Sequence, residues 1–443
     1  MSSPAPVRIN MLTTAKWQVF RLLERLSDLR SNTAAGHLRL ATPSLARQAV
    51  WVFVSTIGEL NAIDPFLRQL SARLDKLQLV LITDHAHYRD SYAARYPSAE
   101  ICVTRGHGDD ARTLARHFPP RLLVVGEIPC LPSDAPCRFS FAFVLEARRH
   151  AAPAMLVNGW LYHYQPSCRM DTIERALFQR DYLRAFDMIC VQTPDCRDVL
   201  VAAGARPECV TVAGNLKFDS MQRSTWSAAD ARSPRLLRSL IDSARPAIVA
   251  GCVTNESEQR TVLDAFAELR RLHSDALLVL APRHPEVVER MTALQELIAS
   301  RGWCGRFRSS HGDVELAPGV DCLVLDTIGD LRDFYAAATI AHVGVDHNVL
   351  EPLAFEKPVS VVPGWDRTYP SYPVYRLLSN EGALLEAGEP TALAAHWHES
   401  IVRSRRDEGN HLARQALERA RGAVQRHFEA IESCLVAAGA TAT

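Results

Sequence analysis

"WVFVSTIGEL", Trp51–Leu60, is a run of apolar and β-branched residues that stops at Gly58-Glu59. Such a run is typical of a buried strand, and the turn after it indicates that the strand passes into a helix. Glu59 then has two interpretations: a first-turn residue favoured by the helix dipole, or a carboxylate used in chemistry. Asp64-Pro65 offers a second helix start, because Asp is a good N-cap and Pro a good first helical residue.

Short apolar runs alternate with helical patterns along the whole chain of 443 residues. The predicted strands are 51–55, 77–83, 121–126, 154–158, 188–193, 210–214, 247–251, 277–282, 322–326, 340–345 and 359–364. Strands that are apolar on both faces and separated by helices indicate parallel sheets covered on both sides. The series is interrupted once, by a charged, Ser- and Ala-rich stretch at 220–244, which indicates two such sheets.

We therefore predict an α/β protein of two Rossmann-like domains, with parallel sheets facing a central cleft. The first domain is assigned to residues 1–220, a linker to 221–244, and the second domain to 245–443. One long amphipathic helix, with its apolar positions between Leu417 and Leu435, closes the second domain.

Composition excludes several classes of protein. The 50 Lys and Arg balance the 50 Asp and Glu, which argues against a general nucleic-acid binder. The 11 Cys form no CxxC pair, so reduced thiols in a cytoplasmic protein are expected, with neither a disulfide framework nor a zinc site. The sequence contains no apolar run of membrane-spanning length and no motif of an NTPase, dehydrogenase, zincin or hydrolase, and no signal peptide is expected.

The N-terminal segment is locally basic. The first 50 residues hold seven Lys and Arg against Glu24 and Asp28, and "KWQVFRLLERLSDLR" places apolar residues at helical spacing. This helix either packs on its own domain or lies on an anionic membrane surface, which would make the protein peripheral at the inner face of the cytoplasmic membrane.

Polar residues recur where the predicted strands end, and ligands of open parallel sheets bind beyond those ends. The first half supplies Glu59, Glu127 and Lys217, and the second half supplies Arg283, His284, His347, Asn348 and Glu351. This pattern suits an enzyme that binds an anionic nucleotide on one side of a cleft and an acceptor on the other.

Five blocks carry a family resemblance: "STIGEL", "GNLKFD", "APRHPE", "DTIGDLRDFYAAATIAHVG" and "HNVLEPLAFEKPV". In this order they resemble the Kdo transferases, GT-B glycosyltransferases that move 3-deoxy-D-manno-octulosonic acid (Kdo) from CMP-Kdo onto lipid A. The resemblance implies inverting transfer without a metal or cofactor, a CMP-sugar as co-substrate, and a glycolipid or other glycan as acceptor.

The resemblance also implies roles for individual residues. Glu59 stands where the family has its general base, and Arg283 would pair with the donor phosphate or carboxylate. The block at His347 would open a helix whose N–H groups suit a phosphate, and Glu351 would accept hydrogen bonds from ribose. The remaining donor-side candidates are Thr254, Glu258, His284, Asp326, Thr327, Gly329 and Asn348, and the acceptor-side candidates are Ser55, Gly58, Glu127, Asn158, Asn215 and Lys217.

Two departures from the family pattern keep alternatives open. The loop "GVDHN" is short and holds Asp346, and "NGWLY" at Asn158–Tyr162 removes an arginine. A transferase with a different nucleotide donor or a soluble acceptor is one alternative. A catalytically inactive GT-B binding module and a sugar-nucleotide epimerase of the same fold are the others.

Overall fold

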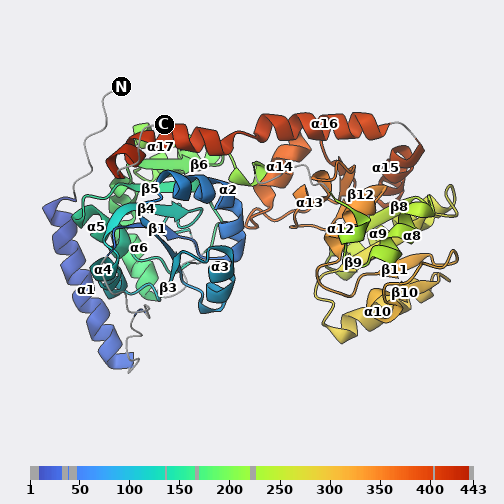
Figure 1. The fold of residues 1–443 in the computed structure, drawn as a ribbon, viewed down its shortest axis with the longest axis horizontal. Helices are drawn as coiled ribbons and strands as arrows, with labels where there is room; N and C mark the ends of the chain where they lie inside the picture. The colour runs from blue at the N-terminus through green and yellow to red at the C-terminus, as the bar shows by residue number, and fades with distance from the viewer. Residues whose placement is uncertain are drawn as a thin grey trace. The chain divides into compact units, whose positions relative to one another are not determined.

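The computed structural model describes residues 9–31, 38, 47–134, 137–164, 169–219, 226–402 and 405–438 (Figure 1). The chain forms two compact units, one of Met1–Ser220 with Ala420–Thr443 and one of Met221–Arg419. Each unit contains a seven-stranded sheet whose paired strands all run parallel. The predicted α/β class with two parallel sheets is confirmed.

The first sheet has the strand order β3-β2-β1-β4-β5-β6-β7. Its strands are β1 (Ala49–Phe53), β2 (Gln78–Thr83), β3 (Glu100–Val103), β4 (Pro120–Gly126), β5 (Ala154–Gly159), β6 (Met188–Val191) and β7 (Val210–Val212). The helices of this unit are α1 (Met11–Ser31), α2 (Ile57–Arg73), α3 (Arg89–Arg95), α4 (Gly108–His117), α5 (Ala142–Arg149), α6 (Arg169–Ala185), α7 (Pro194–Ala202) and α17 (Ala423–Ala438).

Strand β1 shows why this sheet is covered on both faces. Trp51 and Phe53 point into a core shared with α1, α4, α5, α6 and α7. Val50 and Val52, which alternate with them, point into a second core shared with α2 and α17. Because successive side chains of a strand point to opposite faces, an unbroken apolar run is what burial on both faces requires.

The second sheet has the order β10-β11-β9-β8-β12-β13-β14. Its strands are β8 (Ala247–Val253), β9 (Leu277–Pro282), β10 (Gly305–Phe307), β11 (Cys322–Val324), β12 (Ile340–Val343), β13 (Val359–Val361) and β14 (Leu385–Glu386). Its helices are α8 (Pro234–Asp242), α9 (Glu256–Arg270), α10 (Val288–Ala299), α11 (Arg308–His311), α12 (Leu331–Ala337), α13 (Leu350–Leu353), α14 (Tyr372–Asn380), α15 (Pro390–Val402) and α16 (Arg405–Ala420).

All eleven predicted strands are present, and the three strands that were not predicted are β3, β10 and β14. Each of these three lies at an edge of its sheet and is between two and four residues long. A strand this short, paired on one side only, does not need the apolar run that marks a central strand.

Of the two helix starts that the sequence offered, the structure has the one before Glu59 and not the one at Asp64-Pro65, and part of the predicted linker is helical. Helix α2 begins at Ile57 and contains Pro65, because Thr56 has the extended backbone of an N-cap and its hydroxyl accepts the N–H of Glu59. Asp64 instead forms ion pairs with Arg68 and Arg95. In the predicted linker, residues 234–242 form α8, which buries three leucines in the second unit.

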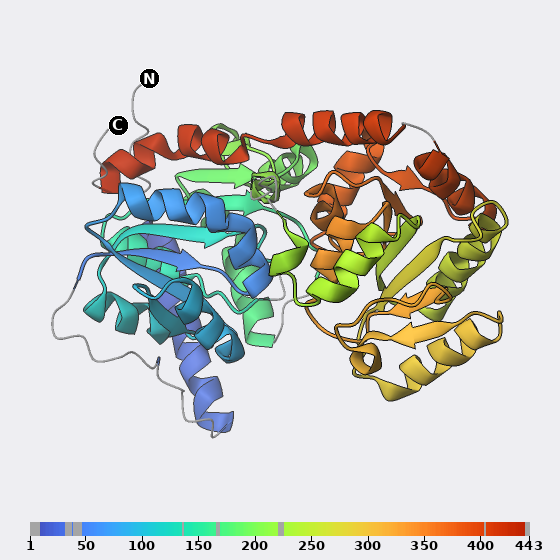
Figure 2. The ribbon, with the colours of Figure 1, turned by 45° about the vertical axis from the view of Figure 1, so that its right-hand side comes forward.

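The C-terminal segment is not one long helix. Gly422, with φ +82°, separates α16 from α17 (Figures 1 and 2), and the Asp219 carboxylate accepts the N–H groups of Gly422 and Val424. Helix α17 belongs to the first unit, where Val424, Phe428 and neighbouring residues enter its core. The assignment of residues 245–443 to one domain is corrected, since an amphipathic pattern specifies a buried face but not the sheet that covers it.

Candidate functional site

The strand order of the first unit predicts where a ligand would bind. Strand β1 lies between β2 and β4, so the order reverses there, and ligands of such sheets bind beyond the carboxyl ends of the two strands at this point. Glu59 follows β1 and Glu127 follows β4. The structure therefore brings these two predicted carboxylates to one edge of one sheet.

Glu59 is held tightly in the first turn of α2. Its Oε2 accepts the N–H of Ser55 at 2.9 Å and its Oε1 accepts the hydroxyl of Thr56 at 3.0 Å. Only 5% of the residue is exposed. Burial raises the pKa of Glu59 well above the ordinary value, and the charges of Glu127 and Asp84 raise it further against these two hydrogen bonds. Glu59 is thus both a helix-capping residue and a perturbed carboxyl group.

Glu127 is the centre of a second, buried set of contacts. Its Oε1 accepts the phenol of Tyr162 at 2.7 Å and lies 3.8 Å from Nζ of Lys217, and its Oε2 accepts Nδ2–H of Asn158 at 3.4 Å. Tyr162 comes from the "NGWLY" segment that departs from the family pattern. This segment lacks the arginine of the family pattern but supplies a hydrogen-bond donor to a buried carboxylate.

Asn158 connects this set to the C-terminal helix. Its N–H donates to Nε2 of His427 at 3.1 Å, and its Oδ1 accepts the N–H of Leu216 at 2.9 Å. Burial lowers the pKa of His427 to about 4, so the imidazole is neutral and its Nε2 accepts. Asn215 donates to Gln192 at 2.8 Å nearby. Sequence reasoning missed His427, because it lies 269 residues from Asn158 and has no motif around it.

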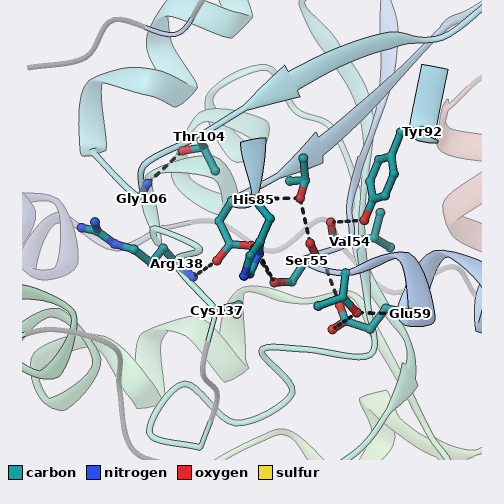
Figure 3. Close-up of polar contacts among 12 residues, drawn as sticks. Val54, Ser55, Glu59, His85, Tyr92, Thr104, Gly106, Cys137 and Arg138 are labelled. Atoms are coloured by element: carbon teal, nitrogen blue, oxygen red, sulfur yellow. Dashed lines mark hydrogen bonds and ion pairs between the residues drawn. The ribbon is translucent and has the colours of Figure 1, made fainter. Parts of the chain in front are cut away.

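A third set of contacts lies at the ends of β1 and β2 (Figure 3). The Ser55 hydroxyl donates to Oδ1 of Asp84 at 2.6 Å, and Nδ1 of His85 lies 3.0 Å from the same oxygen. Sequence reasoning included Ser55 but missed Asp84 and His85, although their position directly after the predicted strand 77–83 is the signal used elsewhere. Gly58 is exposed, and a Cβ there would make only an ordinary contact.

The second unit has its own reversal of strand order, between β8 and β12. Gly344, after β12, lies so close to the backbone of Cys252 in β8 that a Cβ at this position would be 2.3 Å from the Cys252 carbonyl oxygen. Thr254 and Glu258 follow β8, and His347 follows β12. Three of the predicted donor-side residues therefore meet at one place.

Their contacts fix the protonation of His347. The Thr254 hydroxyl donates to the carbonyl of Cys252 at 3.0 Å, and its Oγ1 lies 3.2 Å from Nε2 of His347. Because the hydroxyl proton is already used, Nε2 of His347 carries a proton and donates to Oγ1. Burial lowers the pKa of His347 to about 4, with Arg283 and His284 adding to the effect, so the ring is neutral. Glu258, 5% exposed, accepts the N–H groups of Val345 at 3.0 Å and Thr254 at 3.4 Å.

The block "HNVLEP" opens a helix, as predicted, but this helix is short. Helix α13 is one turn, Leu350–Leu353, and the Asn348 side chain already accepts the N–H of Leu350 at 3.1 Å. A single turn does not provide the set of free N–H groups and the dipole of a full helix. Asn348 and Glu351 are exposed, as are Arg283 and His284 beyond β9. Asp346 accepts the N–H of Asp366 at 2.7 Å.

Asp326 and Thr327 are engaged in loop contacts of their own. Asp326 accepts the N–H of Ser309 at 2.8 Å, and the hydroxyl of Thr327 donates to Asp330. Gly329, with φ +98°, forms the turn between them and α12. These contacts match capping and turn roles rather than a shared site with Thr254.

Strained backbone marks the same strand ends. Five non-glycine residues with positive φ follow or end sheet strands, namely Glu127, Asn158, Cys252, His284 and Asp346. A positive φ costs a non-glycine residue roughly 1–3 kcal/mol, and such residues cluster at active sites and ligand-binding sites. Within the described ranges, no three His, Cys, Asp or Glu side chains are grouped as metal ligands.

Comparison with known proteins finds similarity both in sequence and in fold. Residues 21–220 match the family model described as 3-deoxy-D-manno-octulosonic-acid transferase (kdotransferase). The chain is 27% identical to a 3-deoxy-D-manno-octulosonic acid transferase of Bordetella pertussis, over 90% of each chain, and 26% identical to that of Haemophilus influenzae, over 88% of this chain and 87% of the relative. The UDP-GlcNAc 2-epimerase of Neisseria meningitidis shares its fold, with a TM-score of 0.57, 14% identity and coverage of 87% of this chain and 99% of that one.

Proposed function

We propose that the chain is a divergent member of the 3-deoxy-D-manno-octulosonic-acid (Kdo) transferase family with an α/β GT-B fold, and that it moves Kdo or a related ulosonic acid from a CMP-sugar to a hydroxyl of a glycan or glycolipid acceptor. The proposal assigns the acceptor chemistry to the first unit and nucleotide binding to the second. A single observation supports it most: each sheet gathers polar residues at its own reversal of strand order. The comparisons favour no alternative donor.

The proposed chemistry follows from the acceptor. A sugar hydroxyl is a weak nucleophile, and a carboxylate that accepts its proton during attack on the anomeric carbon makes it a better one. We assign this role to Glu59, with inversion at the anomeric carbon and CMP as the leaving group. The proposal needs neither a metal nor a cofactor, because Arg283 provides a positive charge for the phosphate or carboxylate of the donor.

Calorimetric titration with CMP, UDP and GDP tests the donor. We expect CMP to bind more tightly than UDP or GDP, and Arg283→Ala to weaken CMP binding by about tenfold to a hundredfold, the loss of one charge-assisted hydrogen bond. Arg290→Ala is the matched control, because Arg290 is an exposed arginine on α10. Tighter binding of UDP or GDP would instead favour the transferase with a different donor.

The N-terminal helix supports contact with a membrane surface. One face of α1 packs in the first core through Trp17 and Phe20, as one of the two interpretations expected. The opposite side exposes large apolar residues, namely Met11, Leu12, Val19, Leu22, Leu23 and Leu26. Arg21, Arg25, Arg112 and Arg149 line a pocket of about 200 Å³ between α1, α4 and α5, where Arg21 pairs with Asp109 and Arg149 with Glu146. Arg25 and Arg112 are exposed, and exposed arginines beside apolar side chains suit the surface of an anionic bilayer.

Among the helices of the described residues, none has the length and hydropathy of a membrane span. On the strength of the exposed apolar face of α1, we propose a peripheral position on the inner face of the cytoplasmic membrane. The ten described cysteines are all free, and eight of them are buried, which supports a reducing compartment.

Sedimentation with vesicles of phosphatidylglycerol and phosphatidylethanolamine tests this contact. Replacing Leu22 and Leu26 by Ser should lower the vesicle partition coefficient at least tenfold, because each leucine buries apolar surface worth on the order of 1 kcal/mol. Leu272→Ser is the matched control, since Leu272 is 65% exposed but lies on the second unit. If the variant with Leu22→Ser and Leu26→Ser sediments with the vesicles as much as wild type does, the membrane role of α1 is contradicted.

A further inference from the structure

We propose that Asp84 and His85 form a binding subsite for a sugar hydroxyl of the acceptor. In this subsite the buried carboxylate orients the imidazole, and the free ring nitrogen accepts a hydrogen bond from the hydroxyl. The chemical class of the ligand rests on the proposed function. The subsite itself rests on contacts at the ends of β1 and β2, where Glu59 also lies (Figure 3).

Asp84 is an orienting carboxylate. Only 4% of its side chain is exposed. Its Oδ1 accepts the Ser55 hydroxyl at 2.6 Å, and its Oδ2 accepts the backbone N–H of Arg138 at 2.8 Å. These two donors fix both oxygens, so the Asp84 carboxylate can hold the His85 ring in one orientation.

The contact of Asp84 with His85 determines the tautomer of the imidazole. An ionised carboxylate can only accept, so the 3.0 Å contact between Oδ1 and Nδ1 places the ring proton on Nδ1. The lone pair of a neutral ring is then on Nε2. Within the described part of the chain, the hydrogen-bonding contacts of the His85 ring all use Nδ1, and 38% of its side chain is exposed. In the neutral form of the ring, Nε2 is thus an acceptor available to a ligand.

The backbone of this loop is also fixed. The N–H of His85 donates to Oγ1 of Thr83 at 3.2 Å, and the same hydroxyl donates to the carbonyl of Ser55 at 2.7 Å. A residue held by both its backbone and its side chain loses little conformational entropy when it binds a ligand, which favours a binding role.

Ser55 links the subsite to the proposed base. Its N–H donates to Oε2 of Glu59 at 2.9 Å, while its hydroxyl contacts Asp84. Figure 3 shows the side chains of His85 and Glu59 on either side of Ser55. The rings of His87 and Tyr88 lie 5.4 Å and 5.7 Å from the His85 ring, the first perpendicular to it and the second tilted by 49°. A hydroxyl bound at Nε2 would hold the acceptor beside Glu59.

Two substitutions separate the roles of the two ring nitrogens. His85→Asn retains a donor near Nδ1 but removes the distal nitrogen, whereas His85→Gln retains a polar atom near Nε2. With CMP-Kdo as donor and lipid A in detergent micelles as acceptor, we expect His85→Asn to raise the acceptor KM about tenfold, the loss of one hydrogen bond. His85→Gln should recover part of this loss, and the donor KM should stay unchanged in both variants.

Controls make each outcome decisive. His150→Asn is the matched control, because His150 is a partly exposed histidine at the end of α5. An acceptor KM of His85→Asn within twofold of wild type overturns the subsite. Failure of wild type to transfer Kdo to lipid A would overturn the proposed function separately. Binding of lipid A micelles without donor then decides the subsite: weaker binding by His85→Asn supports it, and equal binding overturns it.

Discussion

Glu59→Gln is expected to lower kcat by a factor on the order of 10²–10⁴ while CMP binding is retained, because the substitution removes a proton acceptor but no nucleotide contact. The carboxylate lies after β1 beside Glu127, at the reversal of strand order where ligands of such sheets bind. Gln has the shape of Glu; its carbonyl oxygen can accept the N–H of Ser55, and its amide N–H can donate to the Thr56 hydroxyl. The measurement is CMP release from CMP-Kdo in the presence of lipid A.

Thr56→Val is the matched control for the structural role of Glu59. It removes the N-cap hydroxyl, which accepts the N–H of Glu59 and donates to its carboxylate, but leaves the carboxylate in place. We expect this variant to lose about 1 kcal/mol of unfolding free energy and to keep most of its turnover. Full turnover by Glu59→Gln would remove Glu59 from the mechanism.

The pH dependence of Glu59→Gln adds a second test. Because the pKa of Glu59 is raised, the folded protein holds this proton more tightly than the unfolded chain does. The stability from this group is therefore greatest below the ordinary pKa of Glu and declines as the pH rises towards the raised pKa. At neutral pH, Glu59→Gln should unfold no earlier than wild type. The acidic limb of the wild-type rate profile should lie above the ordinary pKa of Glu and be absent from the variant.

Lys217→Met is expected to lower the free energy of unfolding by about 3 kcal/mol, because it leaves a buried carboxylate without its cation. The Glu127 side chain is only 1% exposed, and Nζ of Lys217 lies 3.8 Å from its Oε1. Tyr162 and Asn158 still donate to this carboxylate in the variant. Urea unfolding followed by tryptophan fluorescence measures the loss.

A double variant separates the ion pair from the packing of Lys217. Adding Glu127→Gln removes the charge that Lys217→Met leaves unpaired, so the double variant should recover much of the lost stability. Lys16→Met is the matched control. Lys16 pairs with Asp181 at the surface, with 36% of its side chain exposed, and such pairs contribute about 0–1 kcal/mol. Equal losses for Lys217→Met and Lys16→Met would show that the Glu127 pair is unimportant.

The sequence predicted the positions of many candidate site residues, because the carboxyl ends of parallel strands must lie along one edge of their sheet. Glu59 and Glu127 lie together at such an edge of the first sheet. Thr254, Glu258 and His347 lie together at an edge of the second sheet. Asp326 and Thr327 also follow a strand, but their loop turns them towards Ser309 and Asp330. Being at a strand end brings a residue to the edge, whereas the loop decides where its side chain points.

By itself, the sequence determined eleven of the strands and the division into two α/β sheets, because burial on both faces requires unbroken apolar runs. It also determined the apolar face of the last helix. Only the tertiary structure decided that α17 packs on the first sheet and brings His427 to Asn158. The same holds for Asp84 and His85, which meet Ser55 from the neighbouring strand. Hydrophobic patterning specifies which surfaces are buried, while partners distant in the chain are chosen by packing and hydrogen bonding in three dimensions.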